Sequence, residues 1–261
     1  MSGQRRKGCR FFRAAAAVTA VLLCWPGTAA AAKTGGPGAA LEEENRFDIA
    51  GMALWEEAQE RQRNLPNVKA EIQGTWSLEY GGLKVNRPFS GEADLDGLGT
   101  EQLSGQISFL SAGEETVYSF GGGRVTKKTG GAEKVLVSDP AAWRELSENF
   151  MDRTTYDLSC VKWLRVSGHE EERADGSTVL SYELDGEKAA EQVEPAVKGW
   201  LEGMGLSLSG NEDWFRLDRA EGELTVSSSG YMAVDRIQAE AEIFLGQRTV
   251  KGTFEICIVY G

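Results

Sequence analysis

The chain is short of histidine, proline and positive charge. Its 261 residues include 1 histidine and 6 prolines against 32 glycines, and 28 basic residues against 40 acidic ones, for a net charge of -12. A single histidine, His169, excludes most histidine-based catalytic and zinc sites. The shortage of positive charge argues against a nucleic-acid partner, because phosphate binding needs a concentrated basic surface. The many glycines indicate tight turns, which are typical of a chain rich in β-structure.

The sequence also lacks a nucleophile–base pair, a set of metal ligands and a phosphate-binding glycine loop. Glu92, Asp94 and Asp96 resemble the first half of a calcium-binding loop, but Leu103 stands where that loop needs a bidentate glutamate. Alternation along a strand explains these acids without a metal, and a weak surface calcium site is the alternative. We predict no catalytic residue, no metal and no cofactor, and a protein that is not an enzyme.

The N-terminal region has the three parts of a secretory signal peptide. Residues 1–13 carry five basic side chains and no acid, segment 14–25 is mostly apolar, and alanines fill 29–32. The apolar segment is shorter than the ~20 residues that cross a bilayer. We predict a signal peptide over 1–32, a flexible linker over 33–46, and a secreted mature chain without a transmembrane span. Association with the cell surface is the alternative.

The four cysteines raise two further questions. A lipidated Cys24 would need a small residue before it, and the bulky Leu23 favours soluble secretion over a lipid anchor. Cleavage of the signal peptide leaves Cys160 and Cys257 in an oxidising compartment. They either pair in a disulfide or stay as two buried thiols, and the spacing does not decide between these alternatives.

Strict alternation of apolar and polar residues over 68–80 predicts a long strand with one buried and one solvated face. The same pattern recurs over 89–96, 102–109, 237–245 and 250–260. Glycine-rich turns separate these segments, and short turns join antiparallel neighbours. We expect about ten strands in one antiparallel sheet. On its buried face we place Trp76, Leu78, Phe254 and Ile256, and on its wetter face Glu71, Glu79, Glu240 and Glu242.

Three amphipathic helices interrupt the strands. The first is predicted over 48–62, the second begins at the cap Asp139 and Pro140 and continues to Phe150, and the third follows Asp185 and continues to 205. Each has one apolar stripe, and the concave face of the sheet is the surface available to cover it. The predicted fold class is therefore α+β, with about three helices packed on the concave side of a strongly curved sheet.

The order of these segments carries a resemblance to a known family. The segments are MALWEEAQERQRNLPNVKAEIQGTWSLEY (52–80), VYSFGGGRVTKK (117–128), DPAAWRELSENFM (139–151), TVLSYELDGEKAAEQVEP (178–195) and GELTVSSSGYMAVDRIQAEAEIFL (222–245). Together they resemble the LolA/LppX-like superfamily of exported bacterial proteins, most nearly the secreted and lipoprotein domains of Gram-positive bacteria. The resemblance implies a single half-barrel domain over 47–261. It also implies an apolar hollow, in which some members carry lipids or lipoproteins.

Aromatic and aliphatic side chains on the helices and on the long strand are the candidate ligand-lining residues. They are Trp143, Leu146, Phe150, Trp200, Met204 and Trp76. Core packing between helices and sheet is the simpler explanation for such residues, and a lining for an apolar ligand is the other. We predict a binding protein for a hydrophobic small molecule or lipid. The alternative is a structural or interaction protein of the cell envelope with a filled core.

Overall fold

The computed structural model describes residues 48–150, 160–168, 175–191, 194, 214–245 and 248–261. The predicted signal peptide, the linker, Cys24, Trp200 and Met204 lie outside these residues. Among the residues that are described, no helix is long and apolar enough to cross a membrane.

Both long helices begin where the sequence predicts. Helix α2 (Ile49–Arg63) follows the cap Asp48, whose carboxylate accepts hydrogen bonds from the backbone N–H groups of Ala50 and Gly51. Helix α3 (Pro140–Glu148) follows Asp139, which caps in the same way. Each cap satisfies amide groups that have no partner within the helix. Residues 186–191 are helical too, after the predicted cap Asp185.

All the described strands form a single antiparallel sheet of 11 strands. They are β1 (Asn67–Tyr80), β2 (Leu83–Asp96), β3 (Ser104–Ser111), β4 (Glu114–Gly121), β5 (Arg124–Thr129), β6 (Ala132–Val137), β7 (Val161–Gly168), β8 (Thr178–Leu184), β9 (Phe215–Val226), β10 (Met232–Leu245) and β11 (Arg248–Tyr260). The expectation of about ten was one too few. The edge strand β6 is mostly exposed, so its sequence lacks the alternation of apolar and polar residues by which strands are predicted.

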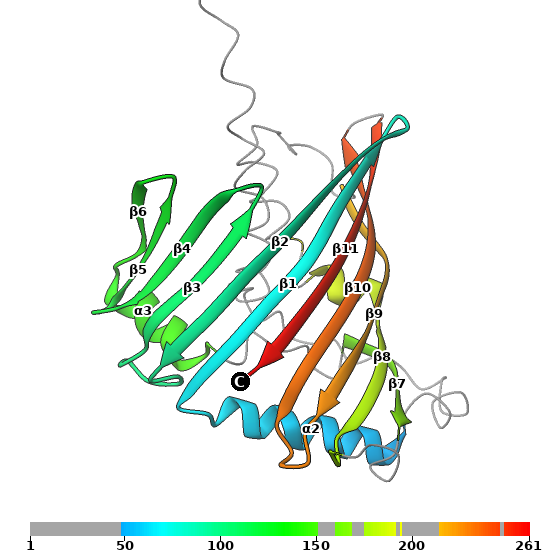
Figure 1. The fold of residues 1–261 in the computed structure, drawn as a ribbon, viewed down its shortest axis with the longest axis horizontal. Helices are drawn as coiled ribbons and strands as arrows, with labels where there is room; N and C mark the ends of the chain where they lie inside the picture. Colours follow the sequence, from blue (N-terminus) through cyan, green and yellow to red (C-terminus); the bar gives the residue numbers. More distant parts are fainter. Residues whose placement is uncertain (1–47, 151–159, 169–174, 192–193, 195–213, 246–247) are drawn as a thin grey trace, which may run out of the picture.

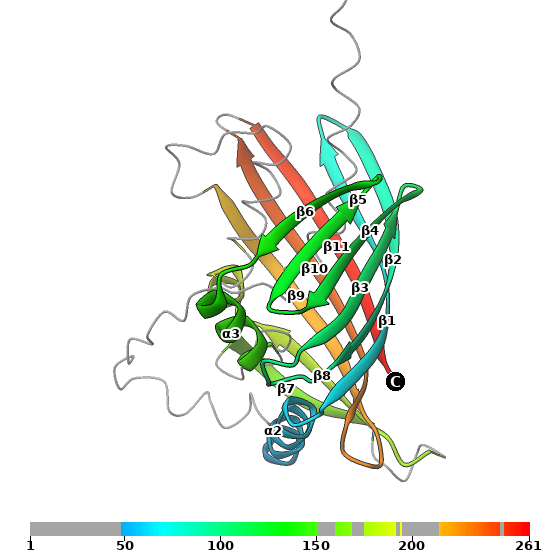
Figure 2. The same cartoon turned by 90° about the vertical axis from the view of Figure 1, so that its left-hand side faces the viewer.

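The order of the strands is β6-β5-β4-β3-β2-β1-β11-β10-β9-β8-β7, so the first and the last strand pair at the centre. Trp76 pairs with Phe254 and Gly74 with Ile256, which confirms the predicted buried face. Glu79 pairs with Lys251 on the opposite, convex face, where Glu240 also lies exposed. Figures 1 and 2 show the sheet strongly curved, as predicted.

Two separate hydrophobic clusters fill the concave side. The α3 core joins α3 to β1–β6 and to parts of β10 and β11, and includes Trp76, Phe89, Phe109, Val125, Trp143 and Leu146. The α2 core joins α2 to β7–β10, and includes Trp55, Ala58, Leu164, Leu180, Tyr182 and Ile237. Tyr260, near the end of β11, packs against both cores and marks the boundary between them.

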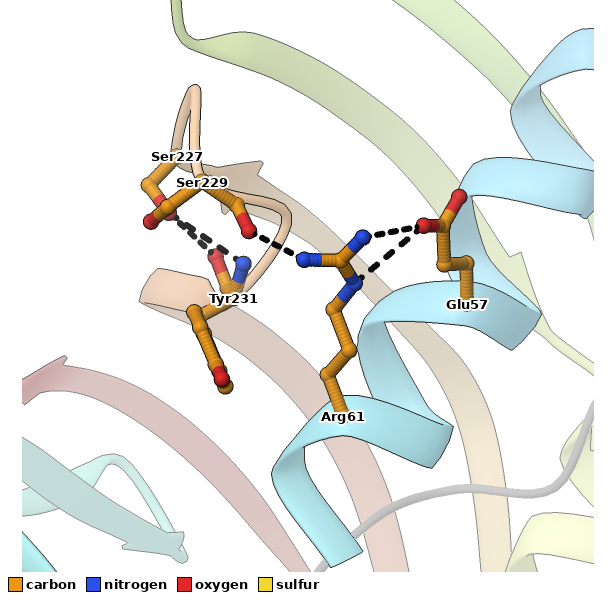
Figure 3. A network of polar contacts seen from close by, with 5 residues as sticks. All are labelled: Glu57, Arg61, Ser227, Ser229 and Tyr231. Atoms are coloured by element: carbon orange, nitrogen blue, oxygen red, sulfur yellow. Dashed lines mark hydrogen bonds and ion pairs between the residues drawn. The ribbon is translucent and has the colours of Figure 1, made fainter. Parts of the chain in front are cut away.

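Helix α2 is tied to the turn between β9 and β10 by Arg61 (Figure 3). Its guanidinium donates to Glu57 Oε1 at 2.6 Å and to the backbone oxygen of Ser229 at 2.6 Å. Gly230, in the same turn, has φ +81°, and a Cβ there would lie 3.0 Å from Arg61 Cζ. A larger residue would therefore strain the backbone and crowd Arg61. This contact holds α2 across one end of the curved sheet (Figure 1).

Candidate functional site: the concave face of the sheet

The structure brings four of the predicted lining residues together. Trp143, Leu146, Phe150 and Trp76 all belong to the α3 core, and each exposes 4% or less of its surface. The Trp143 indole N–H donates to the backbone oxygen of Glu101 at 3.2 Å. These side chains are packed core residues at the base of the concave face.

Three glycines on this face each lie directly opposite an aromatic residue on the next strand. The pairs are Gly74 with Phe89, Gly91 with Phe109 and Gly222 with Tyr182. A Cβ at Gly222 would lie 2.3 Å from Tyr182 Cζ, so the tyrosine ring occupies the space of the missing side chain. Close approach of this kind is a reason for glycine within a strand. Sequence reasoning missed the pairs, because they appear only once the register is known.

The α2 core contains a partly buried acid, Asp235. The Tyr182 hydroxyl donates to Asp235 Oδ1 at 2.9 Å, and the edge of the Trp55 ring packs on Tyr182 with 5.0 Å between ring centroids. Burial raises the pKa of the Asp235 carboxyl to about 6, against a smaller lowering by the Tyr182 hydrogen bond. Extending the alternation of β10 back by two residues from Ile237 would have placed Asp235 on the concave face.

Helix α2 also buries polar atoms against the sheet. Gln62 is 1% exposed, and neither its amide oxygen nor its amide nitrogen has a hydrogen-bond partner among the described residues. The indole nitrogen of Trp55 is in the same situation. Residues seven apart lie on the same side of a helix, so both groups face the concave side. An unsatisfied buried donor or acceptor costs about 1–3 kcal/mol, so this part of the α2 core is less stable than a fully hydrogen-bonded one.

Burial falls steadily along the concave face of β1 and β2 toward the hairpin that joins them. Trp76 and Phe89 expose 2% and 5% of their surface, whereas Val85 exposes 37%, Tyr80 44% and Leu83 75%. Tyr80 pairs with Leu83, and Leu78 pairs with Val85, so these residues continue one face. The apolar series therefore extends beyond the covered core into solvent, and the exposed Arg87, which pairs with Trp76, lies on the same face.

The predicted alternative of a disulfide between Cys160 and Cys257 is wrong. Both residues are thiols in the structure. Cys160 precedes β7 and Cys257 lies on β11, with β8, β9 and β10 between them. Three intervening strands, each about 4.8 Å from the next, place the two sulfurs beyond the reach of a disulfide. Among the described residues, no three histidine, cysteine or acidic side chains are grouped so as to hold a metal.

No protein-family model and no curated protein matches this chain. Several solved structures are similar to it. LprF from Mycobacterium bovis is 14% identical with a TM-score of 0.37, over 80% of this chain and 93% of that one. A DUF1329 family protein from Desulfovibrio piger is 11% identical with a TM-score of 0.27, over 79% and 90%. A LolA superfamily protein from Nitrosomonas europaea is 9% identical with a TM-score of 0.25, over 81% and 91%.

Proposed function

We propose that this chain is an exported, non-enzymatic protein that binds a hydrophobic or lipid-like ligand on the concave face of its sheet. The supporting observation is the apolar series that continues past the α3 core to Val85, Tyr80 and Leu83. Apolar surface left in water costs about 25 cal/mol per Å². A contiguous exposed stretch of it is typical of a surface that meets a ligand or partner.

The ligand would lie where the concave face is only half-buried. Leu78, Phe215, Val250 and Phe254 pack against the rim of the α3 core without being enclosed by it. Trp76 and Trp143 form the base beneath them. Leu146 and Phe150 belong to the same base. Trp200 and Met204, which lie outside the described residues, are predicted to line the site as well.

A second function is favoured by a different observation. Trp143, Leu146 and Phe150 are almost fully buried, as in a core with no room for a guest. A structural or interaction protein of the cell envelope would have this property. The two functions differ in whether an apolar molecule enters the concave side.

Gly252 offers a way to block the proposed site. It lies on β11 opposite Leu78, and a Cβ there would sit 3.6 Å from Leu78 Cδ2 and 3.5 Å from Phe254 Cε2, which are ordinary contacts. Gly252→Val would therefore put bulk onto the ligand face without a clash at Cβ. We expect it to weaken binding of a fluorescent fatty acid on the order of tenfold, with little change in the unfolding midpoint.

The matched control is Thr253→Val, which places the same side chain on the exposed, convex face of β11. It should leave both binding and the midpoint unchanged. Mass spectrometry of an organic extract of the purified protein gives an independent readout. A wild-type protein that yields no extracted lipid and binds no fatty acid would refute the carrier and favour the filled core.

A further inference from the structure

We propose that the end of the sheet opposite α2 docks onto an anionic lipid surface. This docking end comprises the β1–β2 hairpin over 78–88 and the described residues of 242–252 at the ends of β10 and β11, which are 242–245 and 248–252, and Figures 1 and 2 show it far from α2. Tyr80 and Leu83 would enter the membrane interface, and neighbouring cations would contact the headgroups. The inference goes beyond the proposed function, because it concerns where the protein docks and not what it holds.

The exposed apolar side chains of the docking end are contiguous. Tyr80 and Leu83 are paired across the hairpin, and Val85 follows on the same face. The two-residue turn of Gly81 and Gly82, with φ +58° and +80°, keeps the strands paired up to the tip. Elsewhere in the described chain, exposed large hydrophobics are scattered: Ile49, Leu110, Val135, Tyr231 and Val259.

The charge of the docking end is opposite to that of the whole chain. The chain has a net charge of -12, yet these two ranges hold four basic residues, Lys84, Arg87, Arg248 and Lys251, against two acids, Glu79 and Glu242. Glu242 is engaged by Arg216 at 2.7 Å. The Arg248 guanidinium lies 5.7 Å from the centre of the Tyr80 ring, so a cation accompanies the exposed aromatic group.

This distribution fits a membrane better than another acidic protein surface. Lys and Arg side chains are attracted to an anionic bilayer, and aromatic rings with a polar tip favour the headgroup region. The acidic remainder of the chain is repelled by the same surface, which would orient this end toward the bilayer. The apolar face from Leu83 to Trp76 would then open at the membrane.

Co-sedimentation with lipid vesicles tests the proposal. The wild-type protein should bind vesicles of phosphatidylcholine mixed with phosphatidylglycerol, bind phosphatidylcholine alone weakly, and lose binding as salt rises. Leu83→Ser should weaken binding on the order of tenfold. Combining Lys84→Gln, Arg87→Gln and Arg248→Gln should reduce binding to anionic vesicles at least as much. All of these side chains are exposed, so the variants should fold.

The matched controls are Leu110→Ser, an exposed leucine on β3, and the pair Arg124→Gln and Lys128→Gln on β5. They should bind vesicles as the wild type does. Lys84→Gln combined with Lys251→Gln, both exposed and on the convex face opposite the ligand, should weaken binding to anionic vesicles yet retain fatty-acid binding in solution, which separates this proposal from the proposed function. Wild-type protein that ignores anionic vesicles, or Leu83→Ser that binds them fully, would overturn it. So would a wild-type dimer in light scattering that Leu83→Ser dissociates, because the docking end would then be a self-association face.

Discussion

The two halves of the sheet follow one plan but differ in how their cores treat polar groups. Each half has a helix that begins at an aspartate cap and directs a tryptophan inward, Trp143 in α3 and Trp55 in α2. The Trp143 indole N–H is hydrogen-bonded to Glu101, whereas the Trp55 indole nitrogen has no such partner among the described residues. At this pair of tryptophans, the α2 core gives up stability that the α3 core retains.

Titratable groups differ between the halves in the same way. In the α3 half, Lys127 lies at the rim of the core with Nζ 5.5 Å from the centre of the Tyr118 ring. Burial, and then Lys134, lower the pKa of Lys127. In the α2 half, the acid Asp235 lies inside, held by Tyr182. Both halves bury uncharged polar side chains, such as Gln62 on α2 and Ser147 on α3, and the acid with a raised pKa lies in the α2 half.

The largest expected effect comes from truncating the two tryptophans. Trp143→Ala and Trp55→Ala should each lower the free energy of unfolding by about 3–5 kcal/mol, because both side chains are core residues. Denaturant unfolding would give the losses. Hydrogen exchange would show whether each variant loosens its own half first, since the cores are separate clusters.

Conservative variants sharpen the same comparison. Trp143→Phe removes a hydrogen-bonded N–H, whereas Trp55→Phe removes one without a partner. We expect the first change to cost more than the second, by about 1 kcal/mol. Equal losses of unfolding free energy in the two variants would contradict the difference in hydrogen bonding between Trp143 and Trp55.

The next effect is a pH dependence confined to the α2 half. Because the pKa of Asp235 in the folded protein is about 6, above its unfolded value, folding favours its protonated form. This contribution is fully present below about pH 4 and is lost as the pH rises through about 6, amounting to up to ~3 kcal/mol. Asp235→Asn keeps an acceptor for Tyr182 and should remove this pH dependence in denaturant midpoints.

Glu240→Gln, an exposed acid on the same strand, is the matched control and should preserve the wild-type profile. If wild type and Asp235→Asn change in parallel between pH 4 and pH 8, Asp235 does not titrate in this range. The polar character of the α2 core would then rest on its uncharged groups alone.

The smallest effect concerns the helix caps, where the two halves should behave alike. Asp48 and Asp139 each accept two backbone N–H groups at the start of a helix. Asp48→Ala and Asp139→Ala should each cost about 1 kcal/mol, as measured by chemical denaturation. Asp48→Asn and Asp139→Asn retain a capping oxygen and should cost less. A large difference between the two caps would show that one helix is held mainly by its core contacts.

Local signals made much of this fold predictable. The caps Asp48 and Asp139 and the alternation over 68–80 each act within a few residues, so helix starts and strand faces follow from the sequence. The pairing of β1 with β11 does not, because nothing local marks which distant strands will meet. The position of Asp235 on the concave face was also missed, because a polar residue on an apolar face interrupts the alternation by which that face is predicted.

The candidate site was predictable only in part, for the same reason. Periodicity identified Trp76, Trp143, Leu146 and Phe150 as inward-facing, but it could not distinguish a packed base from a ligand lining. That distinction depends on how much of each side chain is covered by its neighbours in the folded protein, as the rise in exposure from Trp76 to Leu83 shows. Coverage is a property of the assembled sheet and is absent from any single segment.

The central pairing of β1 with β11 has a consequence for biosynthesis. β1 precedes all the other described strands in chain order and β11 follows them, so the seam between the halves closes late during synthesis. Until β11 arrives, β1–β6 can form a meander from short hairpins, whereas β8 and β9 are joined through residues 185–214, and the edges at β1 and β10 are unprotected. A nascent chain that stalls before β11 would therefore leave the edges of β1 and β10 exposed, and a chaperone that protects the chain at this stage would have to shield these two strands.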